Sequence, residues 1–542
     1  ALTFEGVTWT YADMLGHIDR MAGALKAGGV QGGTRVGYLG FNHPMFFVTL
    51  FACSKIGAIF VPLNFRLAGP EFEYIINDAG VHTLIVDADH IPVIDTVRDK
   101  LTCNRYLCAH GTPLDAARWP DAAQAMAAAT PVTEAHQPHQ DDVAVIMYTS
   151  GTTGRPKGAM LTAGNFWWNH VSELVMLDLR PDDVLLTFAP VFHIGALNVL
   201  TLTTFLKGAH IVLHRSFDPA AALRDIQQHK VSTIFVVPAM LLFISQHPDF
   251  AKADTSSVRF IMCGGAPCPE PLLHLMSQRG ILVQQGYGLT ETAAMATALS
   301  AEWAVSKIGS VGVSPLLTDV RIVAPDGRVV TQPHERGEVC VRGMNVTRGY
   351  WNQPEATRNT ISDDHWFRTG DVGYFDETGF FYICDRVKDM VITGGENVYP
   401  AEVESVLYAH PSVAEVAVIG APDPQWGEAV VAVARQLALQ SQLLGRDGDL
   451  WRLRVESNSL NQAGTRDRLR AALEAAGHAR QLQVEQGPVT DSPARRLALE
   501  RKASQLLAED IVKSNLQVQT LMRDFGAKIV PGSIKPISIQ PE

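Results

Sequence analysis

The chain has 542 residues, enough for three or four domains of ordinary size, and 46% of them are apolar, which excludes disorder throughout. Its 45 Lys and Arg residues against 56 Asp and Glu residues give a net charge of −11, which excludes a surface that is basic all over and wraps nucleic acid. The seven cysteines are few, odd in number and without CxxC spacing, so we expect no disulfide scaffold or structural zinc site, and a cytoplasmic location. No apolar run reaches the length of about 18 residues that indicates a transmembrane helix. No signal-peptide pattern precedes the aromatic-rich start, and we expect the natural start to lie upstream of Ala1.

The composition of the chain changes near residue 436. Residues 1–435 carry 30 basic and 44 acidic side chains, a net charge of −14, whereas residues 436–542 carry 15 and 12, a net charge of +3. All seven cysteines precede the change. The chain is therefore predicted to consist of two pieces with different histories.

Short β-branched runs alternate with helical segments through most of the first piece. Segments such as Tyr11–Gly28 and Asp218–Gln228 have helical periodicity. This alternation predicts an α/β fold with largely parallel sheets, followed from about 305 to 385 by a small β-rich subdomain with Gly-rich turns. The expected strands are 36–40, 58–64, 83–88, 143–151, 183–190, 209–214, 233–239 and 258–265.

The clearest local motif is Tyr148-Thr-Ser-Gly-Thr-Thr-Gly-Arg-Pro-Lys157-Gly158, directly after an expected strand. Its glycines let backbone N–H groups close on an anion, and its hydroxyls and lysine add donors and positive charge, so it indicates phosphate binding. It does not fit the Walker A pattern. Taken alone it is also compatible with a solvated Gly/Thr turn.

Six further motifs follow in order along the chain: 189–195, 264–266, 285–291, 349–352, 366–371, and 385–389 with 394–400. Together with the phosphate loop they resemble the adenylate-forming (AMP-binding) superfamily, and within it the fatty-acyl-CoA synthetases, over residues 1–435. The resemblance implies an ATP-dependent and Mg²⁺-dependent ligase. Such an enzyme condenses a carboxylic acid with ATP to an acyl-adenylate and pyrophosphate, and CoA then displaces AMP to give the thioester.

The resemblance also implies roles for individual residues. Thr149, Lys157, His193, Thr290 and Glu291 would be catalytic: Thr290 would contact the α-phosphate, Glu291 would hold Mg²⁺, and His193 would stand between the acyl pocket and the α-phosphate and gate CoA. These residue types suit the chemistry, because a carboxylate binds a hard cation and dispersed donors stabilise charge at phosphorus. The nucleotide would be bound by Thr149, Ser150, Gly151, Thr152, Thr153, Gly154 and Lys157 at the phosphates, by Gly264, Gly265, Ala266, Tyr287 and Gly288 at the adenine, by Asp371 and Arg386 at the ribose, and by Gly394 and Gly395 in a lid loop, with Lys388 as the hinge.

Each of these residues also has a structural interpretation when it is taken alone. Glu291 could be a carboxylate in the first turn of a helix, and Asp371 an ordinary turn aspartate. Tyr287 and His193 could simply pack in the core.

The acyl pocket is expected to be lined by residues 192–197, 235–242, Gly286 and 295–310, which are mostly apolar or small. None of them is an aspartate placed to pair with an amino group, and an unpaired ammonium would be unfavourable to bury. A fatty or aryl carboxylic acid is therefore expected in preference to an amino acid.

The lid domain of the family is present only in part. The loop 394–400, a helix from Ala401 and two strands at 413–420 and 428–434 are expected, but no P-x-x-x-G-K motif follows residue 435. In the family the lysine of that motif reaches the α-phosphate and the acyl carboxylate. Loss of one preorganised donor typically lowers a rate by about 10² to 10³, so adenylation is expected to be impaired while thioester formation survives.

The pattern of apolar and helix-forming residues in 436–542 predicts a small β-α-β-α module. Leu450–Val455 alternates as a strand, 465–477 and the segment after Pro493 are helical, and Leu482 and Val484 mark a second strand. The segment resembles the C-terminal domain of the tau subunit of bacterial DNA polymerase III, which implies binding to the catalytic subunit of that polymerase. Its arginines are interpreted as a solvated helix face, so no direct contact with nucleic acid is expected. A real fusion, a sequence-assembly join and a recombined fragment all remain open as its origin.

The expected domains are an adenylation domain (1–385), a partial lid (386–435) and the tau-like module (436–542). The predicted function is an AMP-forming acyl-CoA synthetase with a small-molecule carboxylic acid, ATP and CoA as substrates. Two alternatives are a defective ligase whose tail binds the polymerase, and an enzyme that loads a carrier-protein thiol.

Overall fold

The computed structural model describes residues 2–113, 115–149, 155–386, 390–393, 396–400, 403–404, 417–423, 427–433, 442–447, 450–455 and 481–486. The chain divides into two compact units, Ala1–Lys388 and Asp389–Glu542. Each unit is described by itself.

The first sheet of the first unit has six strands in the order β6-β5-β3-β4-β7-β8. All neighbours are parallel except β7 and β8, which form a hairpin. The apolar runs of the sequence become these strands because a parallel sheet covered on both faces buries every side chain. The strands are β3 (Arg35–Leu39), β4 (Ile59–Leu63), β5 (Val81–Val86), β6 (Arg105–Cys108), β7 (Val143–Thr149) and β8 (Lys157–Thr162).

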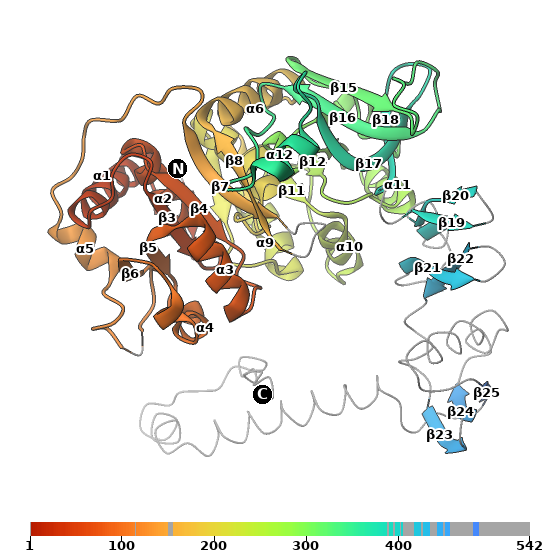
Figure 1. Ribbon diagram of the computed structural model, residues 1–542, viewed down its shortest axis with the longest axis horizontal. Helices are drawn as coiled ribbons and strands as arrows, with labels where there is room; N and C mark the ends of the chain where they lie inside the picture. Colours follow the sequence, from red (N-terminus) through yellow and green to blue (C-terminus); the bar gives the residue numbers. More distant parts are fainter. Residues whose placement is uncertain are drawn as a thin grey trace. The chain divides into compact units, whose positions relative to one another are not determined.

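The second sheet has eight strands in the order β14-β13-β12-β11-β9-β10-β1-β2, with antiparallel pairing only at its two ends. The prediction of an α/β fold with largely parallel sheets is thus confirmed (Figure 1). The strands are β1 (Leu2–Phe4), β2 (Val7–Trp9), β9 (Val184–Thr187), β10 (His210–Leu213), β11 (Thr233–Val236), β12 (Phe260–Cys263), β13 (Val283–Tyr287) and β14 (Thr297–Ala298).

Helices connect and cover the strands. The expected helices at Tyr11–Gly28 and Asp218–Gln228 are confirmed within one residue at each end. The expected strand 233–239 is too long, because Pro238 lacks an N–H group and starts a helix instead. The helices are α1 (Tyr11–Ala27), α2 (Pro44–Lys55), α3 (Gly69–Ala79), α4 (Ile91–Asp95), α5 (Ala122–Ala128), α6 (Ala163–Met176), α7 (Ile194–Ala196), α8 (Leu202–Leu206), α9 (Pro219–His229), α10 (Pro238–Gln246), α11 (Glu270–Gln278) and α12 (Pro354–Thr360).

Helix α2 joins the two sheets into one core. Nearly all of its side chains are buried, as expected for a helix that is apolar all round. The Phe46 ring packs against Phe60 of β4, and the Phe47 ring packs against Phe205 of α8, a helix that contacts β10 of the second sheet. The core therefore fixes the position of one sheet relative to the other.

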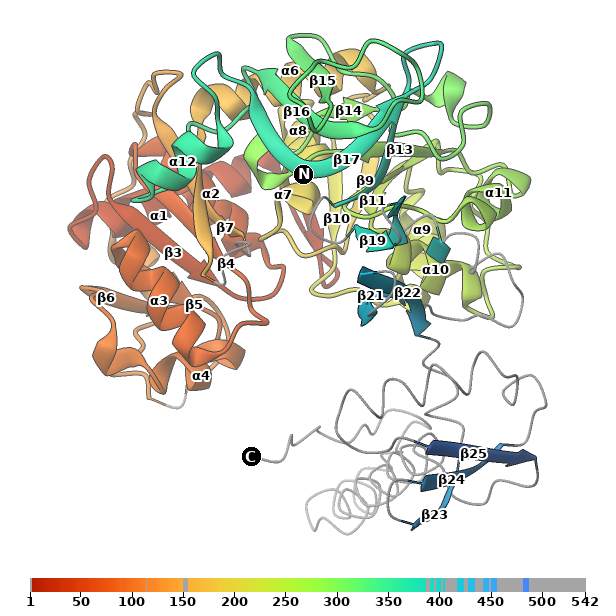
Figure 2. The same ribbon diagram turned by 45° about the vertical axis from the view of Figure 1, so that its right-hand side comes forward.

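A third sheet of the first unit is antiparallel, in the order β15-β16-β17-β18. Figure 2 labels its first three strands, and Figure 1 labels β18 as well. This sheet confirms the β-rich subdomain expected at 305–385. Its strands are β15 (Thr318–Val323), β16 (Gly337–Gly343), β17 (Phe367–Phe375) and β18 (Phe381–Arg386).

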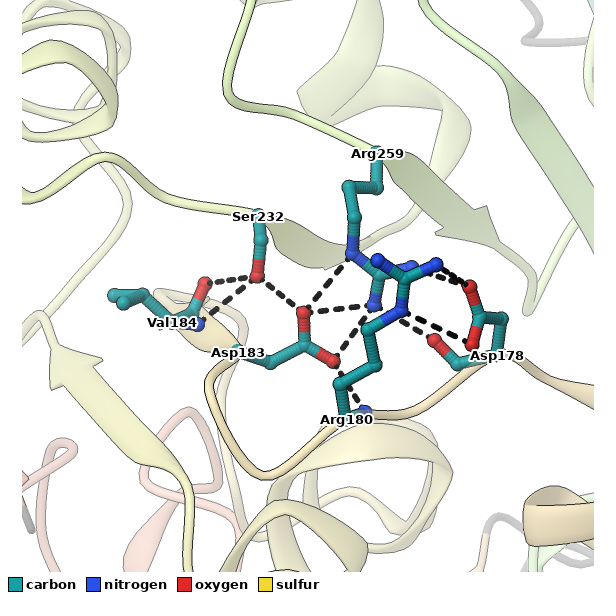
Figure 3. A network of polar contacts seen from close by, with 6 residues as sticks. All are labelled: Asp178, Arg180, Asp183, Val184, Ser232 and Arg259. Atoms are coloured by element: carbon teal, nitrogen blue, oxygen red, sulfur yellow. Dashed lines mark hydrogen bonds and ion pairs between the residues drawn. The ribbon is translucent and has the colours of Figure 1, made fainter.

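A polar network ties together the amino ends of three parallel strands of the second sheet (Figure 3). Arg259, just before β12, donates to both carboxylate oxygens of Asp183 at 2.7 Å and to Asp178 at 2.8 Å. The Ser232 hydroxyl, just before β11, donates to Asp183 at 2.6 Å and accepts from the Val184 amide of β9. The Asp183 side chain is only 5% exposed, so the network pairs a buried charge.

The second unit contains two small sheets, in the orders β20-β19-β22-β21 and β23-β24-β25. The strands expected at 413–420, 428–434, 450–455 and around 482–484 are confirmed as β21, β22, β24 and β25. Most of the helix expected from Ala401 and the helices expected at 465–477 and after Pro493 lie outside the described residues. The strands are β19 (Val391–Thr393), β20 (Glu396–Val398), β21 (Ala417–Asp423), β22 (Gly427–Val433), β23 (Gln442–Asp447), β24 (Leu450–Val455) and β25 (Gln481–Gln486).

None of the helices in the described part of the chain combines the length and the apolarity needed to cross a membrane.

Candidate active site

A cavity of about 1090 Å³ opens in the first unit where the carboxyl ends of the strands of both parallel sheets meet. The first sheet contributes Phe41 after β3, Phe65 and Arg66 after β4, and Thr149 of β7. The second sheet contributes the residues that follow β9, β10, β11 and β12. Ligands of open parallel sheets bind at the carboxyl ends of the strands, so this cavity is the candidate active site.

The hairpin of β7 and β8 brings together Thr149 and Lys157, the two described residues among those expected at the phosphates. Thr149 and Lys157 are register partners, and both line the cavity. The intervening Ser150, Gly151, Thr152, Thr153 and Gly154 lie outside the described residues. The described part thus offers one hydroxyl and one ammonium group to an anion.

Most of the residues expected around adenine and ribose also line the cavity. Gly264, Gly265, Tyr287 and Gly288 line it, whereas Ala266 does not. Gly265 has a φ of +83°, a left-handed conformation that glycine adopts without strain.

A hydrogen bond to Asp371 fixes the Tyr287 ring beside these glycines. The Tyr287 hydroxyl donates to Asp371 Oδ2 at 2.7 Å, and Arg386 Nε lies 3.3 Å from Asp371 Oδ1. Burial raises the pKa of Asp371, and the hydrogen bond from Tyr287 and the charge of Arg386 oppose that rise. Arg386 lines the cavity, and Asp371, only 6% exposed, contacts the residues that line it.

Glu291 lies in a 3-10 turn, Thr290–Thr292, at the edge of the cavity and is 7% exposed. Burial raises the pKa of Glu291, and the Tyr350 hydroxyl opposes this by donating to Glu291 Oε1 at 2.8 Å. Lys157 Nζ lies 5.3 Å from the centre of the Tyr350 ring, so a cation, an aromatic ring and a carboxylate follow one another along this wall.

The donor set fits a magnesium ion that is shared with substrate phosphates. In the described ranges no three His, Cys, Asp or Glu side chains come together where they could hold a metal ion by themselves. Mg²⁺ usually takes one or two protein carboxylates and completes its octahedron with phosphate oxygens and water. Glu291, with one oxygen held by Tyr350, supplies one such ligand.

His193 lines the cavity, and in the chain it immediately precedes α7. The surrounding protein desolvates the imidazole, and the Arg66 guanidinium adds repulsion, so the pKa of His193 falls to about 4. The ring is therefore neutral near pH 7 and can donate or accept one hydrogen bond at each nitrogen without carrying charge.

The apolar end of the cavity agrees only in part with the expected acyl pocket. Residues 193–196, Phe235, Val237, Ala239, Met240, Gly286 and Met295 line it. The other expected residues do not: Phe192, Leu197, Val236, Pro238, Leu241, Leu242 and 296–310. The cavity is also lined by Phe41, Phe65, Phe217, Phe243 and Glu338, which no motif indicated, and by Tyr350 and Arg368, whose motifs carried no assigned role for them. The strand-end rule would have suggested Phe41 and Phe65.

Lys388, Gly394 and Gly395 lie outside the described residues, so the expected hinge and lid loop stay predictions.

Comparison with known proteins agrees with this geometry. Residues 1–351 match the family model described as AMP-binding enzyme, and residues 402–445 match the AMP-binding enzyme C-terminal domain. A feruloyl-CoA synthase from Amycolatopsis sp is 46% identical over 435 residues, which cover 80% of this chain and 84% of that protein. A long-chain-fatty-acid–CoA ligase from Mycobacterium tuberculosis is 40% identical over 438 residues, which cover 80% of this chain and 85% of that protein.

A solved structure extends the similarity to the fold. The o-succinylbenzoate CoA synthetase from Bacillus subtilis, in complex with its acyl-adenylate intermediate, superposes with a TM-score of 0.71 at 31% identity. The superposition covers 92% of this chain and 94% of that one. The family match over most of the chain and the cavity at the strand ends lead to one conclusion: the chain belongs to the AMP-binding enzyme family.

Proposed function

We propose that the acid activated by this AMP-forming acid:CoA ligase is an aryl carboxylic acid whose ring lies among the phenylalanines of the cavity. The observation that carries the proposal is the lining by Phe41, Phe65, Phe217, Phe235 and Phe243. Aromatic pairs contribute about 0.5–1.5 kcal/mol beyond the area that they bury, a gain that an alkyl chain does not provide.

The charges of the lining favour a substrate without an amino group. Among the described residues that line the cavity, the carboxylates are Glu291 and Glu338. Glu338 is paired with Arg368 at 2.6 Å, and Glu291 accepts from Tyr350. Glu338 is therefore already paired and Glu291 is assigned to Mg²⁺, so an amino acid would bind with an unpaired charge.

The relatives support the same substrate class. Two of the three proteins compared above are named for aryl acids, ferulate and o-succinylbenzoate, and one for long-chain fatty acids. A fatty acid is therefore the second candidate. A cytoplasmic location is proposed from the few cysteines of the sequence.

The proposed residue roles are those that the family resemblance implies. Thr149, Lys157 and the loop residues 150–154 hold the β- and γ-phosphates. Thr290 contacts the α-phosphate, and Glu291 holds Mg²⁺, which when bound neutralises phosphate charge. The remaining roles are Gly264, Gly265, Ala266, Tyr287 and Gly288 at adenine, Asp371 and Arg386 at ribose, His193 between the acyl and phosphate ends, Gly394 and Gly395 in the lid loop, and Lys388 as the hinge.

We also propose that residues 1–385, 386–435 and 436–542 are separate domains, and that adenylation is slowed because residues after 435 lack the lysine motif of the lid. The last segment is proposed to bind the catalytic subunit of DNA polymerase III. The parallel pair β24–β25 supports the expected β-α-β arrangement there. A pulldown of that subunit by the full chain, compared with a chain ending at residue 435, tests this binding.

The substrate proposal is tested by acid-dependent thioester formation with acids of equal carbon number. Cinnamic acid should give a higher kcat/KM than nonanoic acid, and Phe235→Leu should lower the ratio. A chain that prefers nonanoic acid would contradict the aryl assignment. Glu291→Gln should abolish Mg²⁺-dependent adenylate formation, and wild-type rates in that variant would contradict the metal role.

A further inference from the structure

The backbone that follows Glu291 is strained. Ala293 has a φ of 51° and Ala294 a φ of 100°, in the left-handed half of conformational space that residues with a Cβ atom rarely adopt. Gly288 lies so close beneath this segment that a Cβ atom there would come within 1.8 Å of the Ala294 carbonyl oxygen. Such conformations persist only where the surroundings hold them.

Three asparagine side chains hold the strained segment by its backbone. Asn345 Nδ2 donates to the Thr292 and Met295 carbonyls at 3.0 and 2.7 Å. Asn198 Nδ2 donates to the Ala293 carbonyl at 2.7 Å, and the Met295 amide donates to Asn169 Oδ1 at 3.2 Å. We call these three residues, Asn169, Asn198 and Asn345, the asparagine clamp.

The clamp is buried and oriented. Asn169 and Asn198 have no exposed surface, and Asn345 is 2% exposed. His170 Nε2 lies 2.8 Å from Asn198 Oδ1, and since this oxygen only accepts, the imidazole must donate. Burial lowers the pKa of His170 to about 4, so a neutral ring fixes which way the Asn198 amide points.

The clamp also joins two walls of the cavity. Asn198 lies in the π-helical turn Leu197–Thr201, which continues the segment 193–196 on the acyl wall, and π-helical turns are frequent at functional sites. Asn169 of α6 donates to the Asn198 carbonyl at 3.0 Å and accepts from Met295, which lines the cavity on the other side. The segment that carries Glu291 and the wall that faces the acyl group are thus one connected piece.

We infer that Asn169, Asn198 and Asn345 are positioning residues for adenylation, which set the distance between the acyl carboxylate and the α-phosphate without contacting either. This inference rests on the proposed role of Glu291 and goes beyond it, because it assigns the geometry of the site to residues outside the cavity lining. A displacement of about 1 Å at reacting atoms can lower a rate by about 10²-fold.

Ser172 offers a matched control, because it lies on α6, the helix that carries Asn169. It is 3% exposed, and its hydroxyl donates at 3.0 Å to the carbonyl of Leu316, a residue that does not line the cavity. Ser172→Ala therefore removes a comparable buried hydrogen bond from α6 without touching the strained segment.

The experiment measures acid-dependent ATP–pyrophosphate exchange in the full chain, together with the melting temperature and the affinity for a non-reactive acyl-sulfamoyl adenosine. Asn198→Ala should lower kcat/KM for the acid by about 10- to 100-fold and weaken binding of the mimic. Ser172→Ala should lower the melting temperature while its exchange rate stays within about twofold of the wild type. Adding Ala294→Gly to Asn198→Ala should restore part of the lost rate, because glycine keeps the positive φ without the clamp.

Two results would overturn the inference: a folded Asn198→Ala variant with the exchange rate of Ser172→Ala, or no rescue by Ala294→Gly. If Asn198→Ala does not fold, Asn345→Ala is tested in its place. That variant removes the two hydrogen bonds from Asn345 to the same strained segment. Glu291→Gln separates the two ideas. An active Glu291→Gln variant contradicts the proposed metal role, whereas an inactive one beside an unaffected Asn198→Ala variant contradicts only the clamp.

Discussion

The hydroxyl of Tyr350 sets the charge state of Glu291, and removing it should shift the pH dependence of the enzyme. The hydroxyl donates at 2.8 Å to a carboxylate that is 7% exposed, and this bond holds the pKa of Glu291 below the level that burial alone would give. A hydrogen bond to a charged group contributes about 1.5–3 kcal/mol. Because about 1.4 kcal/mol corresponds to one pH unit, Tyr350→Phe should move the acid limb of the rate profile up by about one to two units.

The assay is Mg²⁺-dependent ATP–pyrophosphate exchange between about pH 5 and pH 9. The acid limb of Tyr350→Phe should lie at higher pH than that of the wild type, and its rate should recover toward the wild-type rate as the pH rises, because the carboxylate then ionises without the hydroxyl. Tyr382→Phe is the control, since its hydroxyl donates at 3.5 Å to Asp376, which does not line the cavity. An acid limb that stays in place in Tyr350→Phe would refute the reasoning, because Glu291 would not then be the group that must ionise.

Three further predictions concern the charge state of ionisable side chains. Arg259→Met should lower the free energy of unfolding by about 2–3 kcal/mol, because it leaves the buried Asp183 without its cation while Arg259 itself is a quarter exposed. Arg180→Met, at an exposed pair, should lower the free energy of unfolding much less, and equal losses in urea unfolding would contradict this. Burial raises the pKa of Glu173 well above 4.5, so the folded chain keeps a proton that the unfolded chain releases, and stability falls as the pH rises above 4.5. Glu173→Gln should remove a slope of at most about 1.4 kcal/mol per pH unit, and a pH-independent difference from the wild type would count against it. The pKa of His193, lowered to about 4, predicts a neutral ring in an NMR titration from about pH 5.5 to pH 8, and a midpoint near 6.5 would show that the ring is not desolvated.

The parallel sheets could be predicted from the sequence because most of their strands are largely apolar runs, whereas β6 (RYLC) and β13 (VQQGY) are not and were missed. The ends of the strands were harder to predict. The apolar run 233–239 continues through Pro238, and only the structure shows that β11 ends at Val236 and that α10 begins at Pro238. Local apolarity does not distinguish a strand end from the first turn of a buried helix.

The polar residues of the site could be predicted from sequence motifs, whereas the apolar residues that line the cavity could not. Thr149, Lys157, Tyr287 and Glu291 each belong to a segment whose composition indicates phosphate, base or metal binding, and all line the cavity. The phenylalanines come from separate elements: Phe41 and Phe65 follow β3 and β4, Phe217 follows β10, and Phe235 and Phe243 lie in β11 and α10. Only the topology brings these elements to one cavity. The asparagine clamp is further removed from any local pattern, because its three members come from separate segments and meet at one backbone turn.

The most direct test of the account is ATP–pyrophosphate exchange by the full chain with cinnamic acid, with and without Mg²⁺. The account predicts exchange that requires both the acid and the metal and that disappears in Glu291→Gln. Absence of exchange, in a chain that still forms the CoA thioester from supplied acyl-adenylate, would contradict the claim that this cavity activates the acid with ATP.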